Sequence, residues 1–144
     1  MIIALGADHG GFELKEAVRR HLDECGIQYR DYGTRTGEAC DYPEMAKAPC
    51  KAVVSGECGA ALLFCGSGIG ISMAANRLRG IRAAVCSDYF SAKYTRLHND
   101  ANVLCLGGRV VGTGLACELV DVFLSTGFEG GRHQRRIDLI EQMQ

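Results

Sequence analysis

Hydrophobic and polar positions along the chain alternate between two patterns. Short runs of β-branched and other apolar residues, typical of strands, are separated by stretches whose apolar residues recur every three to four positions, as on one helix face. The apolar runs predict strands over 2–7, 27–32, 60–65, 81–86 and 102–107. The helical stretches predict helices over 11–25, 42–55, 88–97, 113–125 and 132–143, and a further helix after the glycine turn of 66–70.

The order of these elements predicts the fold class. Strands that alternate with helices over short connections form a parallel sheet with helices on both faces. We therefore expect an α/β protein: a Rossmann-like three-layer α/β/α sandwich around a parallel sheet of about five strands. Residues 1–144 contain no repeat or linker and should form one domain. The runs 60–65, 81–86 and 102–107 are expected to be buried, whereas Pro49 should interrupt the hydrogen-bond ladder of the helix over 42–55 or kink it.

Charge and hydropathy exclude several classes of protein. The net charge of −1 creates no field that nucleic acid or an anionic membrane would follow. No apolar run approaches the roughly 20 residues that a membrane span needs. The N-terminal MIIALGADHGG lacks the positive start of a secretory signal. We therefore expect a cytoplasmic protein that binds neither nucleic acid nor a membrane.

The eight cysteines are unusual for a chain of this length. They form no CxxC pair and have no His at zinc-ligand spacing, so no metal site is predicted. Most lie inside or beside apolar runs, and seven of the eight are predicted to be small buried hydrophobic residues in a reducing compartment. Cys65 is the exception, because it joins the most apolar strand to a glycine-rich turn.

The turn Cys65-Gly66-Ser67-Gly68-Ile69-Gly70 lies where a parallel sheet binds ligands, beyond the carboxyl end of a strand. Its glycines let backbone N–H groups approach an anion closely. Ile71 follows where a nucleotide-binding P-loop, a dinucleotide fingerprint or a cysteine phosphatase would need Lys, Gly or Arg, respectively. A thiolate at Cys65 could act as a nucleophile or a general base, but a buried cysteine that ends a core strand explains the residue equally well.

Other polar residues gather at predicted element ends. Asp8 and His9 follow the first strand, although Asp8 is also well explained as a helix cap. His98-Asn99 precedes another strand and could simply form a turn. Arg132 and Arg136 share one helix face, where they could clamp a phosphate monoester or remain a solvated basic helix end. Their coincidence indicates an enzyme that acts on a small phosphorylated molecule.

Seven stretches in order along nearly the whole chain resemble the ribose-5-phosphate isomerase B family, which includes allose-6-phosphate and galactose-6-phosphate isomerases. They are GADHGG (6–11), DYP (41–43), CGSGIGISMAAN (65–76), GIRAA (80–84), HNDANVL (98–104), LGGR (106–109) and FEGGRHQRR (128–136). The resemblance implies a Rossmann-like aldose–ketose isomerase of the pentose phosphate pathway. It implies no metal or other cofactor, and a homodimer or homotetramer with sites at the subunit interface.

The resemblance also implies a role for each matching residue. Cys65 would be the base that moves a proton between C2 and C1 through a cis-enediolate, and His98 would assist opening of the furanose ring. Ser67 and the amides of Gly66, Gly68, Ile69 and Gly70 would hold the enediolate oxygens. The sugar hydroxyls would be bound by Asp8, Tyr42 and Asn99. The phosphate would be surrounded by His9, Arg109, Arg132 and Arg136, with Arg109 supplied by the partner subunit.

The chain departs from the family in two positions. Ser67 stands where many members carry Thr and keeps the hydroxyl, and Pro49 interrupts a helix expected to be continuous, away from the motifs. Three other functions remain open at this point. The substrate could be a hexose 6-phosphate, since pocket length decides between pentose and hexose. A Cys-His hydrolase or acyl transferase would form a covalent adduct at Cys65. A non-catalytic sugar-phosphate sensor would bind ligand without exchanging its protons.

Overall fold

The five predicted strands form one parallel sheet in the computed structural model, which describes residues 1–143. Their order across the sheet is β2-β1-β3-β5-β4. The bounds are β1 Ile3–Ala7, β2 Tyr29–Asp31, β3 Ala60–Cys65, β4 Ala83–Val85 and β5 Val103–Gly107. In the register at the centre of the sheet, Cys65 at the end of β3 lies beside Gly107 at the end of β5. The predicted Rossmann-like α/β fold is confirmed.

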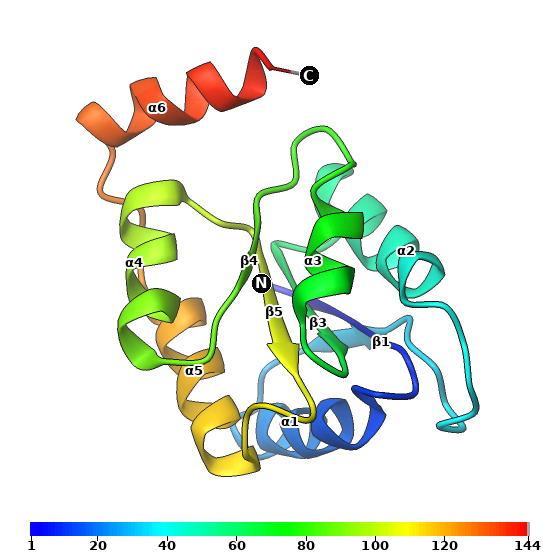
Figure 1. Cartoon of the computed structure of the whole chain (residues 1–144). Coiled ribbons are helices and arrows are strands. Elements are labelled where there is room, and N and C mark those ends of the chain that lie inside the picture. The colour runs from blue at the N-terminus through cyan, green and yellow to red at the C-terminus, as the bar shows by residue number, and fades with distance from the viewer. Residues whose placement is uncertain (144) are drawn as a thin grey trace.

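Six helices accompany the sheet within residues 1–143 (Figure 1). Their bounds are α1 Phe12–Glu24, α2 Tyr42–Val54, α3 Ile69–Ala75, α4 Tyr89–Asn99, α5 Thr113–Ser125 and α6 Arg132–Glu141. Helices α1, α4 and α5 bury apolar residues in the core on one face of the sheet, and α2 and α3 do so on the other. Helix α6 packs against α4 at the end of the sheet where α4 terminates. No helix among residues 1–143 combines the length and hydropathy that crossing a membrane requires.

The strand predicted over 81–86 is shorter and less buried than expected. Strand β4 covers three residues, Ala83 and Ala84 are half-buried, and Val85 is exposed. The expectation of a buried central strand is wrong because β4 is the edge strand beside β5, with no neighbour on its other side. Apolar runs reveal strands but not their place in the order of a sheet.

Helix α2 continues through Pro49, and only its hydrogen-bond ladder is interrupted there, as the sequence predicts. Proline has no N–H for the carbonyl of Met45, so the helix loses one hydrogen bond there. Gly6 of β1 lies under this turn: a Cβ on Gly6 would come within 2.7 Å of the Met45 oxygen and 2.9 Å of the Pro49 ring. The buried proline therefore packs directly against the strand.

The prediction that seven cysteines are buried holds for four of them. Cys50, Cys58, Cys86 and Cys105 are buried, as is Cys65 itself. Burial raises the pKa of the Cys50 thiol to about 12 and, with the Asp88 charge, that of Cys86 to about 11. Cys25 is exposed, and Cys40 and Cys117 are half-buried. For these three the expectation is wrong, because two lie outside the helices and Cys117 lies at the flank of the α5 face that packs on the core.

Candidate active site

The turn between β3 and α3 folds around the sulfur of Cys65. The side chain is buried, and its Sγ accepts a hydrogen bond from the backbone N–H of Gly68 at 3.1 Å. Gly68 has a φ of 79°, and a Cβ there would come within 3.0 Å of the backbone of Leu106. Only glycine fits this left-handed position. The N–H of Ile69 is directed to the Ser67 hydroxyl oxygen at 3.2 Å.

The turn is held from two sides by neighbouring strand ends. The N–H of Gly108 donates to the Cys65 carbonyl at 2.8 Å, and that of Arg109 donates to the Gly66 carbonyl at 3.0 Å. On the other side Gly10 approaches so closely that a Cβ on it would lie 2.9 Å from the Gly66 nitrogen. These contacts fix the thiol relative to the ends of β1, β3 and β5.

Asp8 and His9 lie beside this turn, as the sequence predicts from their position after β1. Asp8 is buried, and its Oδ1 accepts the N–H of Gly11 at 3.1 Å in the turn that precedes α1. Gly11 is the N-cap of that helix, so Asp8 stabilises the preceding turn and is not the helix cap expected from sequence. This contact uses one oxygen and leaves the other carboxylate oxygen available. His9 is exposed, and its Nδ1 accepts the N–H of Cys40 at 3.3 Å.

Tyr42 and Arg109 complete the groups around the turn. Tyr42 begins α2 and places its ring over Gly70, so closely that a Cβ on Gly70 would lie 2.7 Å from a ring carbon. The Arg109 guanidinium lies over Gly66 of its own chain, with Nη1 3.4 Å from the position of a Cβ. This differs from the expectation that a partner subunit supplies Arg109. A hollow of about 290 Å³, lined by His9 and Arg109 among others, opens next to the turn.

His98 and Asn99 lie at the opposite end of the sheet. They end α4, which leads into the start of β5, whereas Cys65 lies beside the last residue of β5. Strand β5 has five residues, so at about 3.3 Å per residue the two ends are about 13 Å apart along the strand alone. Within one chain, the structure therefore does not bring His98 to Cys65.

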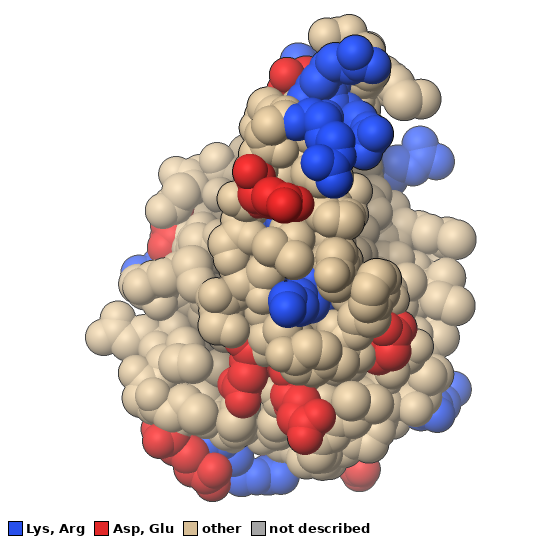
Figure 2. Space-filling model, turned by 90° about the vertical axis from the view of Figure 1, so that its left-hand side faces the viewer, with Lys and Arg blue, Asp and Glu red and all other residues tan. Residues whose placement is uncertain are grey.

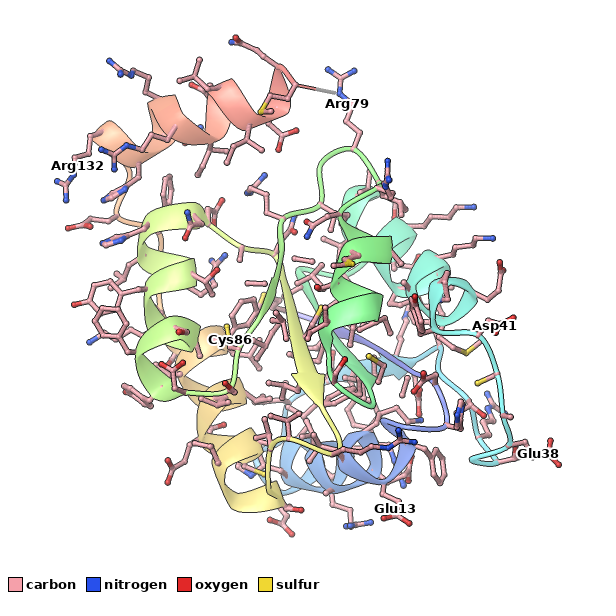
Figure 3. All side chains as sticks on the ribbon, in the orientation of Figure 1. Glu13, Glu38, Asp41, Arg79, Cys86 and Arg132 are labelled. Atoms are coloured by element: carbon pink, nitrogen blue, oxygen red, sulfur yellow. The ribbon has the colours of Figure 1, made fainter. Side chains whose placement is uncertain are left out.

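Arg132 and Arg136 accompany His98 at that end. Both are exposed on α6, over which positive side chains gather at the top of Figure 2. Figure 3 shows Arg132 extending from the end of α6, far from Glu13 and Asp41 near the strand ends. The sequence-predicted residues thus form two groups: Cys65, Ser67, Asp8, His9, Tyr42, Arg109 and the loop glycines in one, and His98, Asn99, Arg132 and Arg136 in the other.

Sequence reasoning missed two members of the second group. His133 is buried beneath His98, with the two rings stacked at 4.2 Å between centroids. Burial lowers the pKa of His133, and the charges of His98 and Arg132 lower it further. Glu129 lies between them, 3.7 Å from His98 Nε2 and 3.4 Å from His133 Nε2. The spacing of His133 and Ile137, four apart on the buried face of α6, is the signal that could have identified the histidine.

Large apolar side chains are exposed along the edge strand and its neighbours. Val85 of β4, Tyr89 and Phe90 of α4, and Val110 after β5 are all at least 43% exposed. Val85 also reaches the active-site turn, since its Cγ2 lies 2.9 Å from the position of a Cβ on Gly68. Exposed apolar groups of this kind mark surfaces that bind other proteins. This surface runs from the turn toward α4.

Comparison with known proteins assigns the chain and its fold to a family. The family model described as Ribose/Galactose Isomerase matches residues 3–140. Ribose-5-phosphate isomerase B of Escherichia coli K12 is 50% identical over 138 residues, which cover 96% of this chain and 93% of that protein. The structure of ribose-5-phosphate isomerase B from Clostridium thermocellum has a TM-score of 0.98 at 46% identity, with 99% of this chain and 97% of that chain covered. The corresponding structure from Thermotoga maritima has a TM-score of 0.96 at 49% identity, covering 98% and 97%. The chain therefore belongs to the ribose/galactose isomerase family, in its ribose-5-phosphate isomerase B group, and is an isomerase.

Proposed function

We propose that this isomerase interconverts D-ribose 5-phosphate and D-ribulose 5-phosphate through a cis-enediolate, with Cys65 as the base. The observation that carries the proposal is the hydrogen bond from the Gly68 N–H to Cys65 Sγ, in a turn lined with further amides. A thiolate at this position lies next to backbone N–H donors that can stabilise negative charge on a substrate oxygen. The relatives named ribose-5-phosphate isomerase B support the pentose as the substrate.

The proposed chemistry is a proton transfer between two carbons. In the ring-opened aldose, Cys65 removes the proton from C2, and the electron pair of that bond forms the C1–C2 double bond of the enediolate. The π pair of the C1 carbonyl passes to O1, which takes up the proton that O2 loses. The O2 electron pair then forms the C2 carbonyl as the thiol returns a proton to C1, which gives the ketose. Such a step needs a positioned base and donors aimed at the developing oxyanion. Ser67 and the amides of residues 66–70 would supply these donors.

The proposed site is complete only with a second copy of the chain. The residues proposed for ring opening and for binding the sugar and its phosphate lie at the opposite end of the subunit from Cys65. They are His98 for ring opening, and Asn99, Arg132 and Arg136 for the sugar and its phosphate. In a two-fold symmetric dimer, each contact between two different surfaces occurs twice. The end of each subunit that carries Cys65 would therefore pack against the α4–α6 end of the other subunit. The exposed Val85, Phe90 and Val110 between the two ends support this contact.

A phosphate remote from the reacting carbons would orient the substrate. Arg132 and Arg136 are four residues apart on α6 and can bind adjacent phosphate oxygens. His9 and Arg109 line the hollow beside the turn and would complete the pocket from the first subunit. Binding energy at the phosphate would then hold C1 and C2 against the thiol.

The test is incubation with ribose 5-phosphate, and separately allose 6-phosphate, in deuterated water, with product formation and C–H exchange followed by NMR. We expect ribulose 5-phosphate with solvent deuterium incorporated, and a loss of about 10² to 10⁴ in turnover for Cys65→Ala. Cys25→Ser, which removes an exposed thiol far from the turn, should leave turnover unchanged.

Each competing function gives a different result in the same assay. Turnover of allose 6-phosphate alone would replace the pentose with a hexose substrate. A stable covalent adduct on Cys65, detected by mass spectrometry, would indicate a hydrolase or acyl transferase. Binding without any exchange would indicate a sugar-phosphate sensor.

A further inference from the structure

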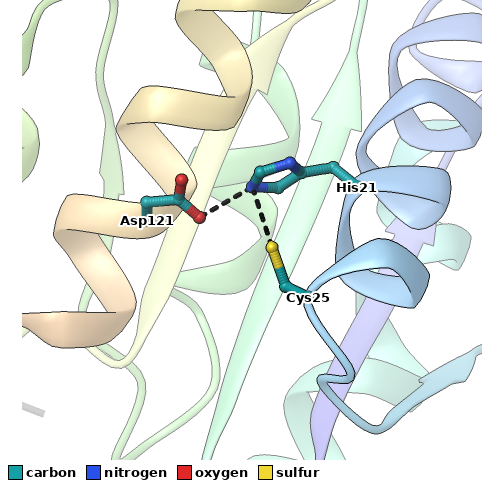
Figure 4. A group of neighbouring side chains, drawn as sticks. All are labelled: His21, Cys25 and Asp121. Carbon is teal, nitrogen blue, oxygen red and sulfur yellow. Dashed lines mark hydrogen bonds and ion pairs between the residues drawn. The ribbon is translucent and has the colours of Figure 1, made fainter.

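A cluster of side chains of the types that bind metals lies where α1 and α5 pack together, away from the active-site turn. His21 and Cys25 come from the last turn of α1 and the residue that caps it, and Asp121 comes from α5 (Figure 4). His21 Nε2 is 2.7 Å from Asp121 Oδ1 and 3.8 Å from Cys25 Sγ. The three candidate ligand atoms all lie within 4.8 Å of one another.

The spacing of these residues presents ligands from both helices toward each other. His21 and Cys25 are four residues apart on α1, and Cys117 and Asp121 are four apart on α5, so each pair lies on one helix face. Cys117 is half-buried, and its thiol pKa is raised by burial and by the nearby charges of Asp121 and Cys25. Its sulfur is not among the ligand atoms that lie within 4.8 Å of one another, so Cys117 borders the cluster without belonging to it.

The separations of the ligand atoms suit a tetrahedral metal ion. Bonds of about 2.0–2.3 Å from zinc to nitrogen, oxygen and sulfur place the ligand atoms about 3.3–3.6 Å apart in a tetrahedron. The 2.7 Å and 3.8 Å separations bracket this range, so shifts below about 1 Å would seat the ion. Imidazole, thiolate and carboxylate together are the ligand types that zinc prefers, whereas calcium and magnesium require mostly oxygen.

We propose that His21, Cys25 and Asp121 bind Zn²⁺, with water as the fourth ligand, and that the ion links α1 to α5. On binding, the Cys25 thiol would lose its proton to solvent, and His21 Nε2, which donates to Asp121 without the metal, would give up that proton and direct its lone pair to the metal. Cys25 caps the C-terminus of α1, where the partial negative charge of the helix dipole also favours a cation. No step of the isomerase reaction passes through this site.

The position of the cluster separates it from catalysis. Helix α1 begins at the carboxyl end of β1 and returns to the opposite end of the sheet before β2, so its last turn is remote from Cys65. The residues of both helices that face the sheet, including Leu22 and Leu119, are fully buried. A metal bridge outside this packed layer would stabilise the folded chain and leave the active-site turn unchanged.

The test uses the whole, chelator-treated protein in a phosphine reductant, with Zn²⁺ and Co²⁺ as probes. We expect one tight site per chain and, with Co²⁺, a thiolate-to-metal charge-transfer band. Zn²⁺ at about 100 times its Kd should raise Tm by about 5–10 °C without changing turnover. Cys25→Ser should abolish most of the band, and His21→Gln should weaken binding by about 100-fold or more, since even outer-sphere changes cost 10–100-fold.

A matched control and a rival site make the result decisive. Glu24→Gln removes a neighbouring exposed charge on α1 that is not a ligand, and it should leave binding nearly unchanged. The other candidate cluster is His98, Glu129 and His133. An unchanged cobalt band in Cys25→Ser, or loss of binding in Cys65→Ala or His133→Gln instead, would overturn the proposal.

Discussion

Mixing two inactive variants tests whether one active site draws on two subunits. Cys65→Ala removes the proposed base from the turn after β3, and His98→Asn removes the proposed ring-opening group from the end of α4. Each variant alone should lose turnover on ribose 5-phosphate, by about 10² to 10⁴ for a positioned acid–base group. In a mixed dimer, the His98→Asn chain still offers Cys65, and the Cys65→Ala chain still offers His98. One of its two sites is therefore intact.

The size of the recovery follows from the geometry. The two residues lie toward opposite ends of β5, whose ends are about 13 Å apart, so a shared site must take one from each chain. Random reassortment of equal amounts makes about half of the dimers mixed, and each carries one intact site of two. Activity should return to about one quarter of the wild-type value, far above the sum of the two variants.

The assay mixes differently tagged variants, allows the subunits to exchange, and measures ketose formation alongside the fraction of mixed dimers. A control pairs Cys65→Ala with Arg109→Met. The Arg109 side chain lies over Gly66 of its own chain, so these two changes damage both sites of a mixed dimer and should show no recovery. Mixed Cys65→Ala and His98→Asn dimers that form but remain inactive would refute the shared site, and so would full activity of Cys65→Ala alone.

Three further predictions concern stability and reactivity. The Lys15 ammonium is fully buried and pairs with the partly exposed Asp31, so Lys15→Met should lower the free energy of unfolding in urea by about 2–4 kcal/mol. Because burial and the charges of His98 and Arg132 lower the pKa of His133, the unfolded chain binds more protons as pH falls below the ordinary value of 6.5. The free energy of unfolding should therefore fall in that range, and His133→Gln should flatten the slope. Iodoacetamide at pH 8 should label exposed Cys25 of the zinc-free protein within minutes and spare Cys50, whose thiol pKa is about 12, as mass spectrometry of the folded protein can show.

The sequence predicts features whose determinants are local. The bounds of β3 and α5 agree with their apolar patterns, and the turn at Cys65 could be identified because its thiol, hydroxyl and glycines lie within six residues. The exposure of β4 could not be predicted, because it depends on the strand order β2-β1-β3-β5-β4, and no single apolar run contains information about that order. The cluster on α1 and α5 could not be predicted for the same reason. The His21–Cys25 spacing is visible in the sequence, but Asp121 is 100 residues away and joins the pair only through helix packing.

The proposed dimer explains why an edge strand of this protein carries apolar side chains. An exposed edge normally invites unwanted pairing and is protected by charge or by a covering element. Here β4 lies between the turn at Cys65 and the end of α4, and the Val85 side chain lies next to Gly68 of that turn. A second subunit that covers this edge would bury Val85 and Phe90, shield the thiol from water, and carry its own His98 to the turn. Val85→Lys should then both dissociate the dimer and abolish turnover, while a folded monomer remains. A monomer with wild-type turnover would show that the apolar edge strand is not needed for catalysis.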